Sequence, residues 1–581
     1  MKKIFYLMLS TLLISIWSCE DSSFLEKAPG IDVTEDTIFS SAAQTELFLN
    51  TIYQYGMHSN LPYYNDDGIS NIFVNPEGYI GGACCDEAEQ CADWYAPQKW
   101  NTGSITADNT DDARWVYRWK AIRYIAVMLE RVDEVPDMSP DYAKQIKAEV
   151  KFLRALNYFE MMKRYGGVPV IDHSIKLDEN LKIPRSTLEE TYNFIMKDLK
   201  EAIPDLQSDQ AGALRGRAHK GAALALKSKA MLYAASKMFN TSTPFMSLGA
   251  NNNLICFGNY KIERWQEAAQ AAYDVLEWAK EAGYHLITDQ GVDENYRYSW
   301  EHYDNAEIIF AEKSNGKRGR WTWPWSSIAP PTIAAGNSGY SGVTPTLNFV
   351  SKYEDRQGRK VDWSGGTGLQ AKMANLDRRF NQTVVGNLGY WNVDCQTVEL
   401  FEGGKHTTSC FGGFWLHKLY PREISEQVWS YQPNSTLFQL NEIYLNFAEA
   451  MTEAYGPDDP QSFEMTARDA INIIRDRSGQ PKITSGSGIY SDFMELIRNE
   501  RALELAFDEH RFWDVRRWLI ADQEGIMQGA MKGIKIYKDT GNEYSYEPYV
   551  FETRTFMKRM YLHPFPTGEI NKGYLIQNPG Y

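Results

Sequence analysis

The sequence is short of positive charge, of cysteine and of long apolar runs. Its 581 residues include 60 lysines and arginines against 76 acidic residues, and the net charge is −16. Binding to nucleic acid requires clustered lysine and arginine that neutralise phosphates, so this balance argues against a nucleic-acid-binding protein. After residue 18 no run is apolar enough to form a membrane-spanning helix of about 20 residues. With 43% hydrophobic residues, the chain has ample material for a folded core.

Motifs of common enzyme classes are also absent from the sequence. We find no G-x-S-x-G nucleophile elbow, no H-E-x-x-H zinc motif and no G-x-x-x-x-G-K-S/T phosphate loop. The cysteines after residue 19 lack the paired C-x-x-C spacing of a zinc site, and are either structural thiols or a loop staple. They are Cys84, Cys85, Cys91, Cys256, Cys395 and Cys410. We therefore predict a protein that is not an enzyme and has no bound cofactor.

The first residues have the form of a secretory signal peptide. Two lysines stand near the start, and the apolar run Ile4–Trp17 is shorter than a membrane span. The run leads into Ile-Trp-Ser-Cys, which resembles a bacterial lipobox, where the peptide is cut before the cysteine and the thiol is acylated. Acyl chains on Cys19 would anchor the protein stably, because each buried methylene contributes about 0.8 kcal/mol. We predict a signal peptide over residues 1–18 and a lipidated polar tether over 19–40.

Helical periodicity dominates two parts of the remaining chain. In AEVKFLRALNYFEMMKRYGGVPV, apolar residues recur at helical intervals until two glycines stop the helix. Another helix is predicted to begin near Ser186, with Glu189 completing a capping box. WQEAAQAAYDVLEWA has the small-residue spacing of a tetratricopeptide repeat, and NEIYLNFAEAMTEAYG with ARDAINIIRDRSG forms a comparable unit. We predict a mainly α fold with such helix pairs over 41–283 and 437–581; ordinary bundle packing is the alternative.

Two stretches lack this periodicity and are predicted to form the ligand-binding face. Residues 60–108 and 284–436 are rich in glycine, asparagine, proline and aromatic residues. Long irregular segments in compact proteins are more often functional than idle. The second stretch is predicted to be a loop-rich insertion between helical layers, with few short strands.

The order of the motifs resembles that of the SusD/RagB family. The segments IPRSTLEETYNFIMKDLKEAI, GRAHKGAALALKSKAMLYAAS and RNERALELAFDEHRFWDVRRW follow one another as in that family, and the chain closes on YLHPFPTGEINKGYLIQNPGY. The resemblance runs from the lipobox to Tyr581. Two positions depart from the family pattern: Glu509 stands where glycine is usual, and Phe565 stands where isoleucine is commoner.

The resemblance implies a lipid-anchored protein on the outer-membrane surface that captures oligosaccharides for a SusC-like TonB-dependent transporter. Its fold would be SusD-like, with tetratricopeptide-like helix pairs supporting the loop-rich binding face. RagB-like relatives are associated with peptide uptake, so peptide capture is one alternative; an exported glycosidase and a structural adaptor of the transporter complex are the others. Some relatives bind Ca²⁺, which keeps a calcium ion open as a cofactor, although no EF-hand spacing is present.

Alternating tryptophans in RGRWTWPWSS give the clearest indication of a glycan site. Pro324 favours an extended backbone, in which alternate side chains stand about 6.6 Å apart on one side. Indoles at this spacing can stack against successive pyranose rings, whereas packing into the core beneath the loop is the alternative. We predict that Trp321 and Trp323 bind glycan and that Arg320 donates hydrogen bonds to it.

Aromatic residues in two other segments complete the predicted platform. Trp94 and Trp100 lie in DWYAPQKW, and Tyr296 lies in NYRYSWEHY, at places similar to those of the family's aromatic arc. Stacking alone does not distinguish one hexose from another, so hydroxyl groups need polar partners. Asp67 in YYNDDG is the predicted carboxylate acceptor.

Charged residues in RNERALELAFDEHRFWDVRRW invite a catalytic interpretation. Glu500, Glu504, His510 and Asp514 lie at helical spacings, and His510 is placed to pair with Asp514. Arginines interleave these residues, however, as in an ion-pair network where helices meet. We therefore predict a structural role for this motif.

Overall fold

Helix α6 (Pro140–Tyr165) shows how the sequence builds the helical frame. Ser139 caps its N-terminus by accepting a hydrogen bond from the Tyr142 amide, and Pro140 suits the first turn because it lacks an amide hydrogen. Gly166, at a φ of 78°, follows its last turn. Every residue from Phe152 to Tyr165 is buried, because neighbouring segments cover the helix on all sides.

A computed structural model describes most of the chain, with gaps. The described residues are 34–57, 81–91, 97–110, 112, 114–176, 178–210, 214, 216–313, 333, 342–420, 422, 434–486 and 490–581. Among these residues no helix combines the length and the apolar character that a bilayer crossing requires.

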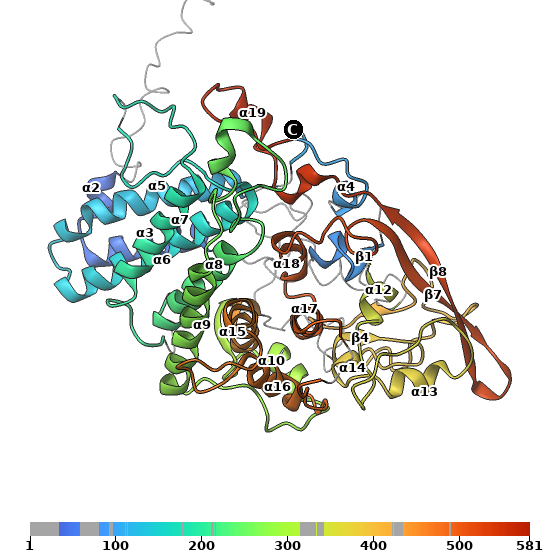
Figure 1. Cartoon of the computed structure of the whole chain (residues 1–581). Coiled ribbons are helices and arrows are strands. Elements are labelled where there is room, and N and C mark those ends of the chain that lie inside the picture. The colour runs from blue at the N-terminus through green and yellow to red at the C-terminus, as the bar shows by residue number, and fades with distance from the viewer. Residues whose placement is uncertain are drawn as a thin grey trace, which may run out of the picture.

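The frame is an array of helices that pack on one another in chain order. Its members are α2 (Glu35–Ile38), α3 (Ala42–Gly56), α5 (Trp115–Arg131), α6, α7 (Leu188–Ala202), α8 (Lys220–Ala235), α9 (Glu263–Ala282), α15 (Leu440–Tyr455), α16 (Ala467–Arg477) and α17 (Phe493–Glu504). From α3 onward each main helix packs against the next, and α9 packs directly on α15 although the insertion separates them in sequence. Figure 1 shows this array on the side opposite the yellow insertion.

The capping box of α7 lies one residue later than predicted. Thr187, not Ser186, accepts from the backbone of Glu190, and the Glu190 carboxylate accepts from the Thr187 amide in return. The pattern S-T-x-E-E allows both registers, and the structure adopts the one that buries Leu188 against the array.

Strands are few and short, and they pair two by two. The antiparallel pairs are β1 (Ala88–Gln90) with β3 (Val343–Pro345), β2 (Ile308–Lys313) with β6 (Asn434–Gln439), β4 (Val384–Val385) with β5 (Trp415–Leu416), and β7 (Gly529–Lys538) with β8 (Tyr544–Arg554). The remaining helices are short: α4 (Pro97–Asn101), α10 (Asn295–Glu301), α12 (Leu347–Val350), α13 (Leu369–Ala374), α14 (Arg379–Thr383), α18 (Arg511–Arg517) and α19 (Thr567–Ile570). The predicted mainly α fold with few short strands is confirmed.

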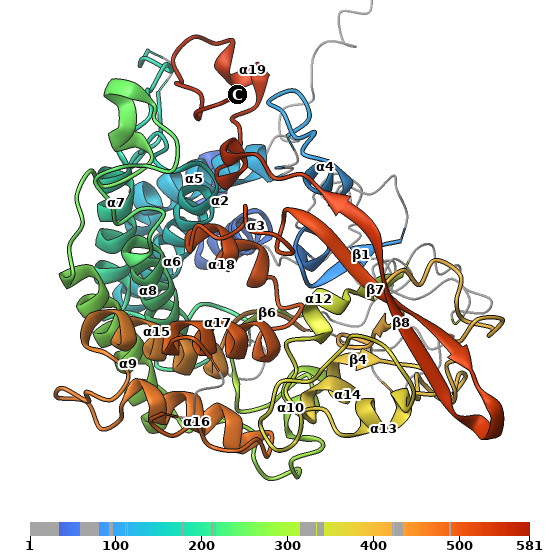
Figure 2. The same ribbon diagram turned by 45° about the vertical axis from the view of Figure 1, so that its right-hand side comes forward.

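The part predicted as C-terminal helical, 437–581, ends instead in a long β-hairpin and loops. Strands β7 and β8 pair along their whole length, from Gly529 with Arg554 to Lys538 with Tyr544. The hairpin lies along the insertion, as Figures 1 and 2 show in red beside yellow. Both strands bond to it: the amide of Gly366 donates to Tyr546, and the Ile534 amide donates to the insertion backbone.

Two hydrophobic cores follow from this arrangement. One core fills the helical array, and the other joins side chains of the insertion to those of the hairpin, such as Ile534 and Tyr546. Segments far apart in sequence therefore share the second core. The two cores meet along α17 and the residues that follow it, because Phe507 belongs to the second core and Leu505 to the first.

One further sequence prediction needs correction. The predicted tether over 19–40 is too long, because α2 is already folded and Phe39 is buried against the array. Of the two alternatives for the cysteines, the structure shows thiols rather than a loop staple, because none of the six cysteines after residue 19 forms a disulfide.

Candidate ligand-binding site

Most residues of the predicted glycan site lie outside the described residues. They are Trp94, Trp321, Trp323, Asp67 and Arg320, and the predicted lipidation site Cys19 lies outside them as well. Their roles stay predictions. The described residues do show where the segments that carry them join the frame.

Trp100 is buried, which contradicts its predicted role as a sugar platform. Only 1% of the residue is exposed, because the one-turn helix α4 turns the indole into the core. Phe512 meets the indole edge-to-face at 5.0 Å between ring centroids, and His563 packs on it at 4.9 Å. Arg516 lies over the ring at 5.2 Å. The indole has no free face for a sugar ring.

Tyr296 is equally enclosed, and the structure contradicts its predicted sugar contact. The Tyr296 hydroxyl donates to the backbone oxygen of Glu504 at 3.0 Å and accepts from Lys418 Nζ at 2.9 Å. The Arg477 guanidinium lies over its ring at 5.3 Å. Burial raises the pKa of the Tyr296 hydroxyl well above its usual value. The residue belongs to a buried network of charges.

That network includes the acids of the motif that resembled a catalytic site. Arg379 Nη1 donates to Glu500 at 2.6 Å and to Glu504 at 2.9 Å, and Arg475 reaches Glu500 at 3.2 Å. Arg477 also pairs with Glu504. All five side chains are buried, so these carboxylates have arginine partners and no exposed surface for a substrate. The structural interpretation of the motif is confirmed.

His510 does not pair with Asp514, the contact that the catalytic interpretation would require. Asp514 accepts instead from Arg501 at 3.1 Å and from Arg517 at 2.7 Å. His510 Nε2 lies 3.7 Å from Glu442, and burial holds the pKa of the imidazole well below its usual value. The two arginines occupy the carboxylate oxygens that the histidine would need.

One hollow lies where two predicted binding segments leave the described frame. It has a volume of about 520 Å³, and both Met57 and Lys313 line it. Met57 is the last described residue before 58–80, the segment that contains Asp67, and Lys313 directly precedes 314–332, which contains the alternating tryptophans. We call it the loop-base hollow. The fold thus brings together the bases of two segments that are far apart in sequence.

A third segment, 423–433, returns to the frame at the same place. Asn434 pairs with Lys313 in the β2–β6 ladder, and its side-chain oxygen accepts from Lys313 Nζ at 3.1 Å. This segment contains Trp429 and Tyr431, which sequence analysis did not single out.

The segment that carries Trp94 is anchored beside the far end of the tryptophan segment. The Cys91 amide, just before 92–96, donates to the Gly342 oxygen at 3.2 Å. Gly342 directly follows 334–341. The pairing of β1 with β3 produces this anchor, because it holds the two chain segments in register up to the point where they leave the frame.

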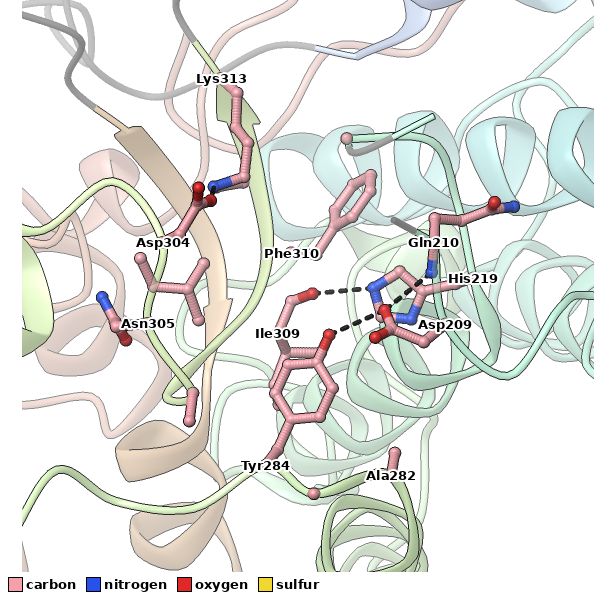
Figure 3. A pocket seen from close by; sticks show the side chains of 15 residues that line it. Asp209, Gln210, His219, Ala282, Tyr284, Asp304, Asn305, Ile309, Phe310 and Lys313 are labelled. Carbon is pink, nitrogen blue, oxygen red and sulfur yellow. Dashed lines mark hydrogen bonds and ion pairs between the residues drawn. The ribbon is translucent and has the colours of Figure 1, made fainter. Parts of the chain in front are cut away.

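A second hollow, of about 400 Å³, adjoins the loop-base hollow, because Gly216 and Lys313 line both. We call it the Asp209 hollow (Figure 3). Its polar side chains include Asp209, Gln210, His219, Tyr284, Asp304, Asn305 and Lys313. Asp209 Oδ1 accepts from the Tyr284 hydroxyl at 2.8 Å and from the Gln210 amide at 2.7 Å.

The walls of the Asp209 hollow are held by contacts behind them. The Tyr284 ring packs against Trp278, with 4.8 Å between centroids, and the indole Nε1 donates to the Ser208 oxygen at 3.2 Å. His219 Nε2 donates to the Ile309 oxygen at 2.8 Å. Burial lowers the pKa of His219, so the imidazole stays neutral at neutral pH and serves as a wall.

Lys313 is the cation shared by the two hollows, and its charge is compensated locally. Its Nζ donates to the Tyr303 oxygen at 2.7 Å and lies 3.3 Å from an Asp304 oxygen. The ammonium also lies 4.2 Å from the centre of the Tyr303 ring. It therefore fixes the end of β2 rather than offering an uncompensated positive charge to an anion.

The described residues contain no group of three or more histidine, cysteine, aspartate or glutamate side chains arranged to hold a metal ion. The calcium ion implied by the resemblance stays a prediction. Sequence analysis also missed the pairing of Asp209 with Tyr284, which lie 75 residues apart and share no motif.

Two family models match the chain. The model described as the SusD family covers residues 306–581, and the one described as starch-binding associating with outer membrane covers residues 23–232. A SusD-like protein of Formosa agariphila is 22% identical over 530 residues, which cover 87% of this chain and 88% of that protein.

Solved structures share the fold over nearly the whole chain. A SusD-like protein from Bacteroides fragilis matches with a TM-score of 0.75 at 26% identity, covering 96% of this chain and all of the other. A laminarin-binding SusD-like protein matches with a TM-score of 0.62 at 20% identity, covering 94% of this chain and all of the other. The arrangement of helical array, insertion and hairpin is thus common to these proteins.

Proposed function

Because the chain belongs to the SusD/RagB family, we propose that it captures glycans at the cell surface and delivers them to a SusC-like TonB-dependent transporter. The matching family model is described as starch-binding and associated with the outer membrane, and one structural neighbour binds laminarin. Acylation of Cys19 would hold the protein on the outer membrane, so that captured glycan stays close to the transporter.

The observation that carries this proposal is that two predicted binding segments begin at the same hollow of the frame. Met57 and Lys313 line one hollow, so the segments with Asp67 and with the alternating tryptophans start from a common place on a rigid frame. A carboxylate acceptor and stacking indoles are the two kinds of group that a sugar needs. The protein binds rather than hydrolyses in this proposal, because arginines occupy the buried carboxylates of its charged motif.

The test is calorimetric titration of the full-length protein with starch and laminarin oligosaccharides, supplemented by a glycan array. Replacing Trp321 and Trp323 by alanine should weaken binding about 10- to 100-fold, because each stacked ring contributes about 0.5–1.5 kcal/mol. Tyr260→Ala is the matched control, because Tyr260 is 59% exposed and lies outside both hollows.

Three outcomes would contradict the proposal. Unchanged binding in the double variant would remove the tryptophans from the site. Binding of a peptide library without binding of any saccharide would favour peptide capture. Release of new reducing ends from a bound polysaccharide would show that the protein is a glycosidase.

A further inference from the structure

We propose that the Asp209 hollow is a subsite for one neutral sugar unit, which extends the glycan site held by the predicted loops. This inference rests on the proposed function. Its chemistry is hydrogen bonding of sugar hydroxyls to the Asp209 carboxylate beside the Tyr284 ring.

Asp209 has one carboxylate oxygen in use and one available. Oδ1 accepts from the Tyr284 hydroxyl and the Gln210 amide, whereas Oδ2 receives no hydrogen bond from any residue that the structure describes. The residue is exposed at the hollow. A carboxylate oxygen accepts two hydrogen bonds, so Oδ2 matches a pair of vicinal hydroxyl groups. Charge-assisted hydrogen bonds of this kind are about twice as strong as neutral ones.

The carboxylate is already oriented before a ligand arrives. Tyr284 holds it at 2.8 Å, and Trp278 holds Tyr284 by ring packing. Trp278 is itself fixed, because only 4% of it is exposed and its Nε1 donates to the Ser208 oxygen. A group that is held in its binding geometry loses little conformational entropy when a ligand binds. Figure 3 shows the Tyr284 hydroxyl directed at the Asp209 carboxylate.

The charges around the hollow favour a neutral sugar over an acidic one. Asp209 and Asp304 both present carboxylates to it, and the lysine of the lining, Lys313, is compensated by Asp304 and by two oxygens. The adjoining loop-base hollow adds Glu46 and Glu312, and its one arginine, Arg217, is compensated by Glu46 at 3.4 Å and by the buried Glu149 at 2.8 Å. A uronic acid or a sulfated sugar would therefore meet repulsion, on a chain whose net charge is −16.

The position of the hollow explains how one glycan would reach it. It shares Gly216 and Lys313 with the loop-base hollow, where the segments with Asp67 and the tryptophans begin. Among the residues that the structure describes, a Cβ at Gly216 would meet the Ala311 oxygen alone, at 3.9 Å. In this proposal a glycan bound by those segments continues from the loop-base hollow into the Asp209 hollow.

The test compares starch and laminarin oligosaccharides of increasing length by calorimetry with the full-length protein. In the wild type, affinity should rise at the length that reaches the hollow. Asp209→Ala should lose that gain, about tenfold for the longest oligosaccharide, and should leave the affinity for short ones unchanged. Tyr284→Phe, which keeps the ring and removes the hydroxyl, should lose part of the gain. Asp289→Ala is the matched control, because Asp289 is exposed and does not line the hollow.

A second readout tests the charge argument with an oligogalacturonide, an acidic probe. The oligogalacturonide should bind the wild type more weakly than a neutral oligosaccharide of equal length does. In Asp209→Asn, which removes one negative charge, the two affinities should differ less. The subsite is contradicted if Asp209→Ala binds oligosaccharides of every length as tightly as the wild type does. If the Trp321/Trp323 double variant loses binding in the same experiment, the proposed function stands. If the wild type binds no saccharide, the proposed function and the subsite both fail.

Discussion

Asp86 and Glu87 are neighbouring carboxyl groups with opposite surroundings. Asp86 accepts from Arg511 Nε and Nη2 at 2.9 and 2.8 Å and lies 3.2 Å from Lys352 Nζ. Glu87 is equally buried, but its carboxylate accepts a backbone hydrogen bond, from Phe507 at 3.3 Å, in place of an arginine pair. Burial and the neighbouring charge of Asp86 raise the pKa of Glu87 to about 8. Glu87 is therefore protonated in the folded protein at neutral pH.

This raised pKa predicts a pH-dependent cost to stability. Glu87 ionises near pH 4.5 in the unfolded chain and only near pH 8 in the folded protein. The free energy that this group contributes to folding therefore decreases as the pH rises from about 4.5 to about 8. Relative to Glu87→Gln, the wild type should lose a few kcal/mol of unfolding free energy over that window. Urea unfolding of both proteins at several pH values measures the difference. Glu281→Gln, at an exposed position, is the control, and a constant difference between wild type and Glu87→Gln would contradict the assignment.

The two departures from the family pattern have visible structural counterparts. Glu509 has a φ of 65°, a left-handed conformation that glycine adopts without strain, which accounts for the usual glycine there. Phe565 is fully buried and stacks on Tyr165 at 4.7 Å, with Arg185 over its ring at 4.6 Å. An isoleucine would lose both ring interactions, so the phenylalanine is matched to these aromatic and cationic neighbours.

At the scale of elements, the packing of α8 on α9 depends on one glycine. A Cβ at Gly221 would overlap the indole of Trp278, the residue that backs Tyr284 in the Asp209 hollow. Small residues on α8 and α9 thus allow the close helix approach that the sequence predicted. The same approach fixes one wall of the hollow.

We expect Gly221→Ala to destabilise the protein by about 1–3 kcal/mol. Helix propensity alone would give a gain of up to about 1 kcal/mol, but the added methyl group forces the indole or the helix to move. Chemical unfolding measures the change. Gly568→Ala in α19 is the matched control, because a Cβ there meets no atom within 4 Å and the change should be neutral or stabilising. A stabilised Gly221→Ala protein would show that the two helices separate easily.

The elements differ in how well sequence predicts them. Long helices such as α6 and α9 follow from apolar periodicity, because each buries one face against the next helix. The β7–β8 hairpin was missed, although burial alternates along most of β7 and Gly541 turns at a φ of 74°. It follows a strongly helical motif, and nothing local shows that its partners lie in the insertion.

The candidate site was less predictable than the fold, for a physical reason. Trp100 and Tyr296 lie on short helices, α4 and α10, of five and seven residues, which are too short for apolar periodicity to reveal which side faces the core. Asp209 and Tyr284 meet only because α8 and α9 pack together and bring their flanking loops side by side. Such contacts are set by tertiary packing, which local patterns do not encode.

At the scale of the whole molecule, buried charges join the insertion to the helical array. Arg379 lies in the insertion and binds Asp377 beside it, and it also binds Glu500 and Glu504 on α17. The array's Arg475 reaches back to Glu354 in the insertion at 2.8 Å. Because these ion pairs are buried, removal of one partner leaves the others uncompensated in a medium of low dielectric constant.

We therefore expect Arg379→Ala to cost about 3–5 kcal/mol of unfolding free energy, because it removes a cation that binds three buried carboxylates. Glu500 keeps Arg475 and Glu504 keeps Arg477, whereas Asp377 loses the arginine that it binds. Arg359→Ala removes an exposed guanidinium from its pair with the buried Asp355 and should cost no more than about 1 kcal/mol, because the Asp355 carboxylate keeps two backbone hydrogen bonds. Urea unfolding, followed by tryptophan fluorescence and by far-ultraviolet circular dichroism, measures both variants.

Because this network lies between the insertion and the helical array, it also predicts the order in which the parts of the Arg379→Ala variant unfold. The wild type should unfold in one transition, because the charges that hold the insertion also hold α16 and α17. In Arg379→Ala the insertion should open first, so fluorescence should report an earlier midpoint than circular dichroism, which follows the helical array. Limited proteolysis should then cut within 342–420 before it cuts the helices. Coincident transitions with a loss of less than about 1 kcal/mol would show that the apolar contacts along α17 suffice to join the two cores.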